Sequence, residues 1–492
     1  MKKLRIFMRD WLFRHPYENA DSTDIYYLEI ANRILNVLAH TDLYTHLCPD
    51  GLMKMSVDIT CMFEDVISES GIWKAFTEET RRRTGSYLPF LDTSCDYYPG
   101  EINLPDVEFM LWYCSQHYHK NDTVISPGSE FVQYLSPRIF GILDSVYETA
   151  PENERLVDFL RADEGLSFDE YMLHIHWLHF NSILNIRAYD VFDDALNDLY
   201  DEENVFDEKM CTYGIAREQS LTDRHPLWAM TTPEWMARLH HGKLRVEVRG
   251  MQYYLFSRMD DNYVYLRPMK DETEELSVVR HSCDISAKTK PDSIIVTCML
   301  VRYEGEWNQL GLLYDMDISE YEKVKSILEE DKELDKFNTK DEDVEKKFLA
   351  VTNGLRVAFV ENFEAYNQFL TSKLETPPFP ESAFPMPKSI PLCAFQGTEQ
   401  SLQICPNRVE AIKHPSNPYY DKAKAENMAL DFVVNERCCS YEQLLYMWDN
   451  GMLPDVMLKC KQGKEYGRRI LQDNFYFFVA YLRQESETAV FD

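Results

Sequence analysis

Three histidines in one short segment are the first candidates for metal chemistry. The stretch HIHWLH holds His174, His176 and His179. On a helix His176 and His179 share a face, but His174 lies about 160° around the axis from His176, so the three rings cannot meet at one metal ion. The His-Glu-x-x-His spacing of zinc peptidases is also absent. Nearby carboxylates that could add ligands are Asp169, Glu170 and Asp190. We predict a helix with half-buried imidazoles and no metal site.

Cys438 and Cys439 are the most conspicuous candidate nucleophiles. They precede Ser440 at the expected start of a helix, where a thiol can have a lowered pKa. We interpret them as buried thiols at a helix boundary. The sequence contains no Gly-x-Ser-x-Gly elbow, Walker loop, kinase lysine strand or dinucleotide fingerprint. The catalytic residues are therefore unknown, and we predict no cofactor.

Two acidic residues lie within an apolar stretch. The segment FEDVISESGIW, residues 63–73, places Glu64 and Asp65 among apolar side chains. Buried carboxylates need hydrogen-bonding or charged partners. These two either cap a neighbouring helix or pair with the arginines of residues 81–83, and we favour a structural ion pair over a functional carboxylate. Other adjacent acids are interpreted as solvated: Asp193-Asp194, Glu202-Glu203, Glu274-Glu275 and Glu329-Glu330.

The overall charge limits the partners. The 492 residues hold 51 lysines and arginines against 83 aspartates and glutamates, a formal net charge of −32. Such a surface repels phosphate backbones and anionic membranes, which argues against direct nucleic-acid binding. Small basic groups are interpreted as solvated faces or ion-pair partners. They are Lys2, Lys3, Arg5 and Arg9; Arg81, Arg82 and Arg83; and Lys459, Lys461, Lys464, Arg468 and Arg469.

The sequence has the features of a cytoplasmic protein. No apolar run approaches the ~18 residues of a membrane-spanning helix. Arg5, Arg9 and Asp10 interrupt any secretory leader. The 12 cysteines include no Cys-x-x-Cys pair, so we expect reduced thiols rather than a zinc ribbon. We therefore expect a cytoplasmic location and no membrane association.

Helical spacing dominates residues 1–242, which we assign to a helical domain. Asp21 can cap one of its helices, and Gly242 can end the last. Longer helices are expected at about residues 24–39, 106–118, 130–147 and 168–200.

From residue 243 apolar and polar residues alternate with a period of two. This pattern predicts a small β-barrel-like module over residues 243–314. Leu244, Val246 and Val248 alternate with charged residues, so we expect one buried and one solvated face. Turn residues separate the strands. These are expected near residues 244–248, 253–256, 263–266, 276–279, 294–301 and 307–313.

The rest of the chain has three expected parts. Residues 315–374 form a charged linker and a long helix with an apolar stripe from Val344 to Leu370. Residues 375–392 form a proline-rich connector. Residues 393–492 form an α-rich region with a short strand near residues 401–405. The predicted class is α+β, with a helical N-terminal region, a small antiparallel β-barrel-like module and an α-rich C-terminal region.

Several short segments combine aromatic, acidic and proline residues in a distinctive way: Asp10-Trp11-Leu12, His15-Pro16-Tyr17, Thr23-Asp24, Tyr26-Tyr27, residues 63–73, Tyr97-Tyr98, Glu101-Ile102-Asn103, residues 417–421 and residues 451–455. In these segments the chain resembles an uncharacterised protein family of Bacteroides-type bacteria. The resemblance runs through nearly the whole chain. It implies a cytosolic bacterial protein and brings no catalytic residue with it.

The leading functional hypothesis is a non-enzymatic protein-binding or scaffold protein. It follows from the missing catalytic signatures, the strong acidity and the aromatic residues of the β-module. We expect Trp307 to be buried and some of Tyr253, Tyr263 and Tyr265 to face a protein partner. One alternative is a hydrolase or nuclease with a dispersed histidine and carboxylate site. A weaker alternative is an acidic factor that docks on a basic partner.

The redox prediction has a direct test. Protein prepared without oxidation and unfolded under non-reducing conditions should titrate with a thiol reagent as about twelve free thiols, because the cytoplasm keeps cysteines reduced. A titre that is lower by several thiols would contradict the cytoplasmic assignment.

Overall fold

The computed structural model describes most of the chain in two compact units. The described residues are 4–40, 48–118, 125–161, 165–202, 208–242, 244–270, 274–338, 341–381, 384, 387–398, 402–405, 409–434, 439–453 and 463–485. The first unit comprises mainly Met1–Met316 and Lys459–Gln484, and the second mainly Asp317–Leu458. Predicted residues that fall outside the described ranges are Lys2, Lys3, Glu203, Cys438, Lys459, Cys460 and Lys461.

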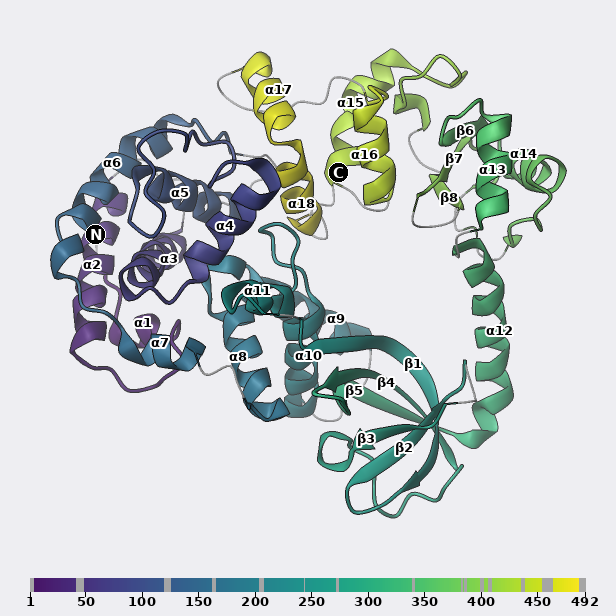
Figure 1. Ribbon diagram of the computed structural model, residues 1–492, viewed down its shortest axis with the longest axis horizontal. Coiled ribbons are helices and arrows are strands. Elements are labelled where there is room, and N and C mark those ends of the chain that lie inside the picture. The colour runs from purple at the N-terminus through teal and green to yellow at the C-terminus, as the bar shows by residue number, and fades with distance from the viewer. Residues whose placement is uncertain are drawn as a thin grey trace. The chain divides into compact units, whose positions relative to one another are not determined.

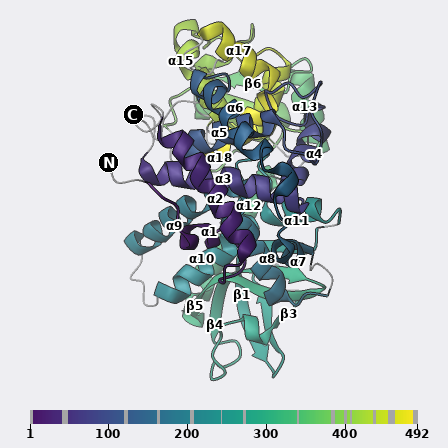
Figure 2. The same cartoon turned by 90° about the vertical axis from the view of Figure 1, so that its left-hand side faces the viewer.

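Helices form the N-terminal part of the first unit, as predicted (Figure 1). They are α1 (Met8–Leu12), α2 (Ser22–Ala39), α3 (Pro49–Ser68), α4 (Ile72–Thr84), α5 (Leu104–Tyr118), α6 (Glu130–Asp144), α7 (Glu154–Arg161), α8 (Phe168–Phe180), α9 (Ala188–Glu202), α10 (Glu208–Thr222) and α11 (Thr232–Leu239). α2 and α3 lie side by side (Figure 2). The Asp21 carboxylate accepts the amides of Thr23 and Asp24, so the predicted cap of α2 is confirmed. None of the described helices is long and apolar enough to cross a bilayer.

The single helix expected over residues 168–200 is wrong, because α8 and α9 are separate. Ser182 lies at the break. Its hydroxyl donates to the Leu178 carbonyl at 2.5 Å and accepts the Leu184 amide at 3.3 Å. Such side-chain bonds to the backbone compete with the helical pattern and favour a turn.

The last helices of the chain complete the core of the first unit. They are α17 (Lys464–Asp473) and α18 (Phe475–Glu485). Phe478 of α18 stacks on Phe90 with ring centroids 5.8 Å apart, and Tyr481 lies 5.2 Å from Trp112. Asn474 separates the two helices and accepts the Phe90 amide through its side chain at 2.8 Å. Residues around 90–112 and around 474–481, which are far apart in the sequence, therefore share one aromatic core.

A closed barrel follows the N-terminal helices, so the predicted α+β class is confirmed (Figure 1). Its strands are β1 (Val246–Met259), β2 (Tyr263–Pro268), β3 (Leu276–Val279), β4 (Ile294–Tyr303) and β5 (Glu306–Asp317), in the order β1-β2-β3-β5-β4. β3 and β5 are parallel and pair at Val278 and Trp307. Trp307 is 7% exposed within the barrel core, so its predicted burial is confirmed.

The predicted burial of the β1 alternation is wrong at two positions. Val246 is buried, but Leu244 is 54% exposed and Val248 36% exposed. A bulge between Arg249 and Gln252 adds one residue to β1 relative to β4. Before the bulge Arg249 is opposite the core residue Leu300, so Val248 lies on the outer face.

The second unit combines helices with a small sheet. Its helices are α12 (Tyr321–Asn338), α13 (Glu342–Val351), α14 (Phe363–Phe369), α15 (Lys422–Val434) and α16 (Tyr441–Asp449). Its antiparallel strands are β6 (Val357–Val360), β7 (Leu392–Gln396) and β8 (Leu402–Cys405). The long helix expected from Val344 to Leu370 is wrong. Asn353 and Gly354 adopt φ of 56° and 86°, which ends α13 and lets β6 begin.

Loss of the Trp307 ring should destabilise the barrel strongly. Trp307→Ala should lower the free energy of unfolding by about 3–5 kcal/mol, because a large buried ring leaves a cavity in the core. Equilibrium urea unfolding measures the change. Tyr98→Ala is the control, because Tyr98 is 57% exposed and its loss should cost less than about 0.5 kcal/mol. A loss below about 1 kcal/mol at Trp307 would mean that the ring does not fill the core.

Candidate functional site

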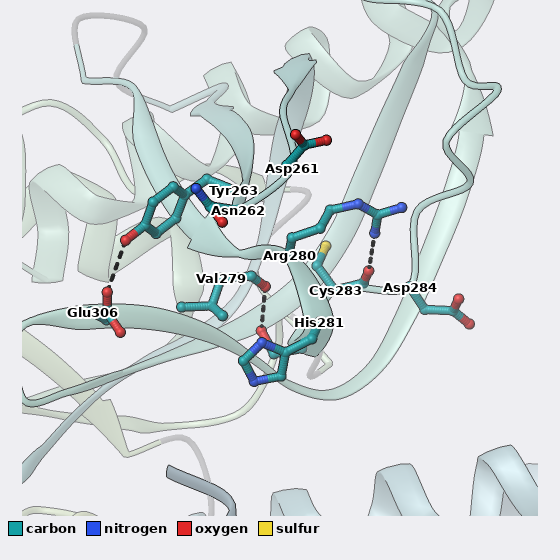
Figure 3. A pocket seen from close by; sticks show the side chains of 10 residues that line it. Asp261, Asn262, Tyr263, Val279, Arg280, His281, Cys283, Asp284 and Glu306 are labelled. Carbon is teal, nitrogen blue, oxygen red and sulfur yellow. Dashed lines mark hydrogen bonds between the residues drawn. The ribbon is translucent and has the colours of Figure 1, made fainter. Parts of the chain in front are cut away.

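A cavity of about 750 Å³ lies at the rim of the barrel. Three segments line it: the turn into β2, the end of β3 with the short helix after it, and the start of β5 (Figure 3). The lining residues are Asp261, Asn262, Tyr263, Val279, Arg280, His281, Ser282, Cys283, Asp284 and Glu306. The cavity adjoins the single described residue pair that joins β3 to β5.

Hydrogen bonds from backbone amides hold the turn into β2 in place. The Asp260 carboxylate accepts the amides of Asn262 and Tyr263, both at 2.8 Å. These bonds favour the charged carboxylate and lower the pKa of Asp260. The Arg280 amide donates to the Asn262 carbonyl at 2.7 Å, which ties the turn to the end of β3.

The segment after β3 is attached to β5 by side chains. The Ser282 hydroxyl donates to the Val279 carbonyl at 2.8 Å and accepts the Gln309 amide at 3.1 Å. The Asp284 amide donates to the Gln309 side chain at 3.1 Å. The rim is therefore organised before any ligand binds.

Polar groups of the cavity already have defined partners. The Tyr263 hydroxyl donates to Glu306 at 2.9 Å, and this hydrogen bond raises the pKa of Tyr263. The Arg280 guanidinium donates to the Cys283 carbonyl at 3.0 Å. Burial raises the pKa of the Cys283 thiol to about 12, so it stays protonated and is a poor nucleophile.

The cavity does not present an acid–base pair. Figure 3 shows that His281, Asp284 and Asp261 point in different directions. Within the described ranges, no group of three or more His, Cys, Asp or Glu side chains could hold a metal ion. The arrangement is suited to binding through hydrogen bonds, charge and an aromatic ring.

Tyrosines on the outer face of β2 extend the site beyond the cavity. Tyr263 and Tyr265 are half-exposed, with ring centroids 6.4 Å apart, while Val264 between them lies in the core. The Tyr265 hydroxyl donates to Asp260 at 2.8 Å. The Arg258 guanidinium lies 3.4 Å from the Tyr265 ring centroid. We call Tyr263, Tyr265 and Arg258 the tyrosine face.

The three histidines of α8 do not converge, and two of them bond to different hydroxyl groups. His176 contacts the Ser220 hydroxyl at 3.3 Å, and His174 lies against Phe159. His179 Nδ1 contacts the Thr232 hydroxyl at 3.1 Å, and the same hydroxyl contacts Nε2 of His225 at 2.9 Å. Burial lowers the pKa of His179 to about 3 and that of His225 well below its usual value, so both rings are neutral.

Neither Glu64 nor Asp65 pairs with the arginines of residues 81–83, so that choice of partner is wrong, but Glu64 does form a structural ion pair, with His15. Asp65 instead caps α4 by accepting the amides of Ile72 at 2.9 Å and Trp73 at 2.7 Å, the alternative that the sequence left open. Glu64 contacts His15 at 2.8 Å, with side chains 1% and 2% exposed. Glu79 is the carboxylate that pairs with Arg82 and Arg83.

The cavity was not predicted from the sequence. Residues 280–284 lie outside the expected strands, and no role was predicted for their polar side chains. The polar run Arg280-His281-Ser282-Cys283-Asp284 between two strands was the available signal. Only the closure of the barrel brings this run beside the turn at residues 261–263.

A family model described as "Protein of unknown function (DUF3843)" matches residues 5–268 and 299–483. No curated protein and no solved structure matches the chain. The predicted resemblance to an uncharacterised family over nearly the whole chain is therefore confirmed, while the Bacteroides-type origin stays a prediction.

The buried histidines predict how stability depends on pH. Unfolded histidines take up protons below about pH 6.5, whereas His179 and His225 stay neutral in the fold. Each should therefore remove about 1.5–2 kcal/mol of stability between pH 6.5 and 5. Urea unfolding measures the free energy of unfolding at the two pH values. The difference between them should be smaller for the double variant His179→Asn, His225→Gln than for the unchanged protein.

The exposed His281 provides the control for this prediction. His281→Gln should leave the pH difference unchanged. His15 acts in the opposite sense. Burial opposes its charge, but Glu64 outweighs this and raises the pKa of His15. The stability that the charged His15 contributes is present at low pH and is lost as the pH rises through that raised pKa. If the double variant lost as much stability between pH 6.5 and 5 as the unchanged protein, His179 and His225 could not be buried in the neutral form.

Proposed function

We propose that this chain, which belongs to the family described as "Protein of unknown function (DUF3843)", is a non-enzymatic protein-binding protein with the barrel as its binding module. The carrying observation is the tyrosine face beside the rim cavity. Tyr263 belongs to both, because it lines the cavity and lies on the outer side of β2. Tyrosine and arginine are enriched at the energetic centres of protein interfaces.

The state of these side chains supports a binding role. Hydrogen bonds to Asp260 and Glu306 hold the two tyrosine hydroxyls, and Arg258 holds the Tyr265 ring. A side chain that is already ordered loses little conformational entropy when a partner binds. The cavity beside them has the volume of a typical binding pocket and is lined mainly by polar residues.

The hydrolase or nuclease alternative loses its main candidates. His15 and Glu64 form a close histidine–carboxylate pair, but both side chains are at most 2% exposed, so a substrate cannot reach them. His179 is also buried and contacts Thr232. The exposed His281 of the cavity points away from Asp284 (Figure 3).

The proposal includes a cytoplasmic location. Seven of the described cysteines are free thiols, in keeping with a reducing compartment: Cys48, Cys61, Cys95, Cys114, Cys283, Cys298 and Cys393. The net charge of −32 favours a protein partner over nucleic acid or an anionic membrane.

Site-specific photo-crosslinking in the native cell tests the proposal. A benzoylphenylalanine at position 253 or 265 should crosslink to one protein that mass spectrometry identifies. The control places the same group at position 98, where the native Tyr98 is 57% exposed and lies outside the barrel. This variant should not capture that protein.

The affinity of the purified partner for variants of the chain then tests the tyrosine face quantitatively. Tyr263→Ala should weaken its binding at least about tenfold with an unchanged melting curve, while Tyr98→Ala changes neither. Unchanged affinity after each of Tyr253→Ala, Tyr263→Ala and Tyr265→Ala would contradict a binding role for the barrel. Unfolding by all three changes would show that the rings serve only the core.

A further inference from the structure

We propose that the rim cavity receives an arginine side chain from a basic segment of the protein partner. This inference rests on the proposed function, because it names the chemistry of the partner that the barrel binds. It follows from a comparison of two similar tyrosine sites on β2.

The two sites share one arrangement. Tyr263 and Tyr265 are two residues apart on a strand, so both rings leave the same face of the sheet. Each hydroxyl donates to a carboxylate, Tyr263 to Glu306 at 2.9 Å and Tyr265 to Asp260 at 2.8 Å. Each site therefore offers the face of an electron-rich ring beside a negative charge.

A guanidinium already occupies one of these sites. Arg258 lies 3.4 Å from the Tyr265 ring centroid and also pairs with Glu275 at 3.0 Å. Stacking on a tyrosine face with a carboxylate at the edge is a favourable geometry for arginine. The chain thus holds an internal example of the ligand that this arrangement binds.

The other site is open to the cavity. No lysine or arginine of the described residues lies over the Tyr263 ring. The cavity carries three carboxylates, Asp261, Asp284 and Glu306, against the single guanidinium of Arg280. Arg280 runs away from Tyr263 toward the Cys283 carbonyl (Figure 3). The vacant ring therefore faces a locally negative cavity.

Among the described residues, two of these carboxylates are not neutralised by an ion pair and so add to the negative potential of the cavity. Within the part of the chain that the structure describes, Asp261 and Asp284 form no ion pair, and both are exposed. By contrast, Arg258 and Arg267 on the barrel wall pair with Glu275 and Asp292. A planar guanidinium can stack on Tyr263 and donate to Glu306 together, which an ammonium group cannot match.

Fluorescence anisotropy with a defined peptide tests the proposal. The probe is an acetylated, fluorescein-labelled hexapeptide of alternating glycine and arginine, added to the full chain at about 150 mM salt to screen long-range attraction. A citrulline peptide of the same length keeps the planar shape but lacks the charge. The arginine peptide should bind at least about tenfold more tightly than the citrulline peptide, with a lysine peptide in between.

A charge-matched pair of variants separates the cavity from the general acidity of the chain. Asp261→Asn with Asp284→Asn removes two charges at the cavity, and Asp193→Asn with Asp194→Asn removes two exposed charges on α9. The cavity variant should weaken binding of the arginine peptide at least about tenfold, and the α9 variant should weaken it less than about twofold. Tyr263→Leu should weaken it similarly, while Tyr98→Leu should not. Melting curves verify that each variant is folded.

Three results would overturn the inference: no binding of the arginine peptide, equal binding of the citrulline peptide, or equal weakening by the two pairs of variants. The last would mean non-specific attraction to an acidic chain. If the purified partner still requires Tyr263 or Tyr265 in that case, the proposed function stands and only the arginine site fails. If the partner is also indifferent to these tyrosines, both fail.

Discussion

The candidate site depends on how the barrel closes. β3 is short and parallel to β5, and Val278 with Trp307 is the described residue pair that joins them. Beyond Val279 the chain leaves the strand, and Ser282 and Asp284 reach Gln309 through side-chain hydrogen bonds instead of a ladder. This incomplete seam leaves a polar cavity at the rim, while the Trp307 ring fills the core below it. The same closure therefore stabilises the module and creates the surface that we propose as its binding site.

The buried histidines and carboxylates of the helical region form hydrogen bonds within the core. His179 and His225 share the Thr232 hydroxyl, His15 contacts Glu64, and Asp65 caps α4. In each case burial accompanies hydrogen bonding, which is the condition for a polar group to be tolerated in a core. The side chains exposed around the barrel include tyrosines and charged groups, and the proposed recognition role rests on these. The proposed binding of a basic segment to an acidic surface would also connect the leading hypothesis with the weaker alternative of a factor docking on a basic partner.

Local patterns predicted the α+β class, the strands of the barrel and most of the helices. Alternation and turn residues are local signals, and Asp21 acts within one helical turn. The failures arise from longer-range effects or from single backbone positions. Val246 and Val248 lie on the same face of β1 but only Val246 is buried, and Asn353 with Gly354 ended a helix whose apolar stripe continued in sequence. The pairing of Phe478 with Phe90 and the cavity itself depend on segments that only tertiary folding brings together.

The proposed binding site for a protein partner is the rim of the barrel. Hydrogen–deuterium exchange of the full chain, with and without its purified partner, measures this most directly, because bound backbone amides exchange more slowly. With the partner bound, we expect slower exchange in peptides that cover residues 260–267 and 279–285, and unchanged exchange in helices α2 to α6. Protection confined to those helices, with no change at the barrel rim, would contradict the proposed site.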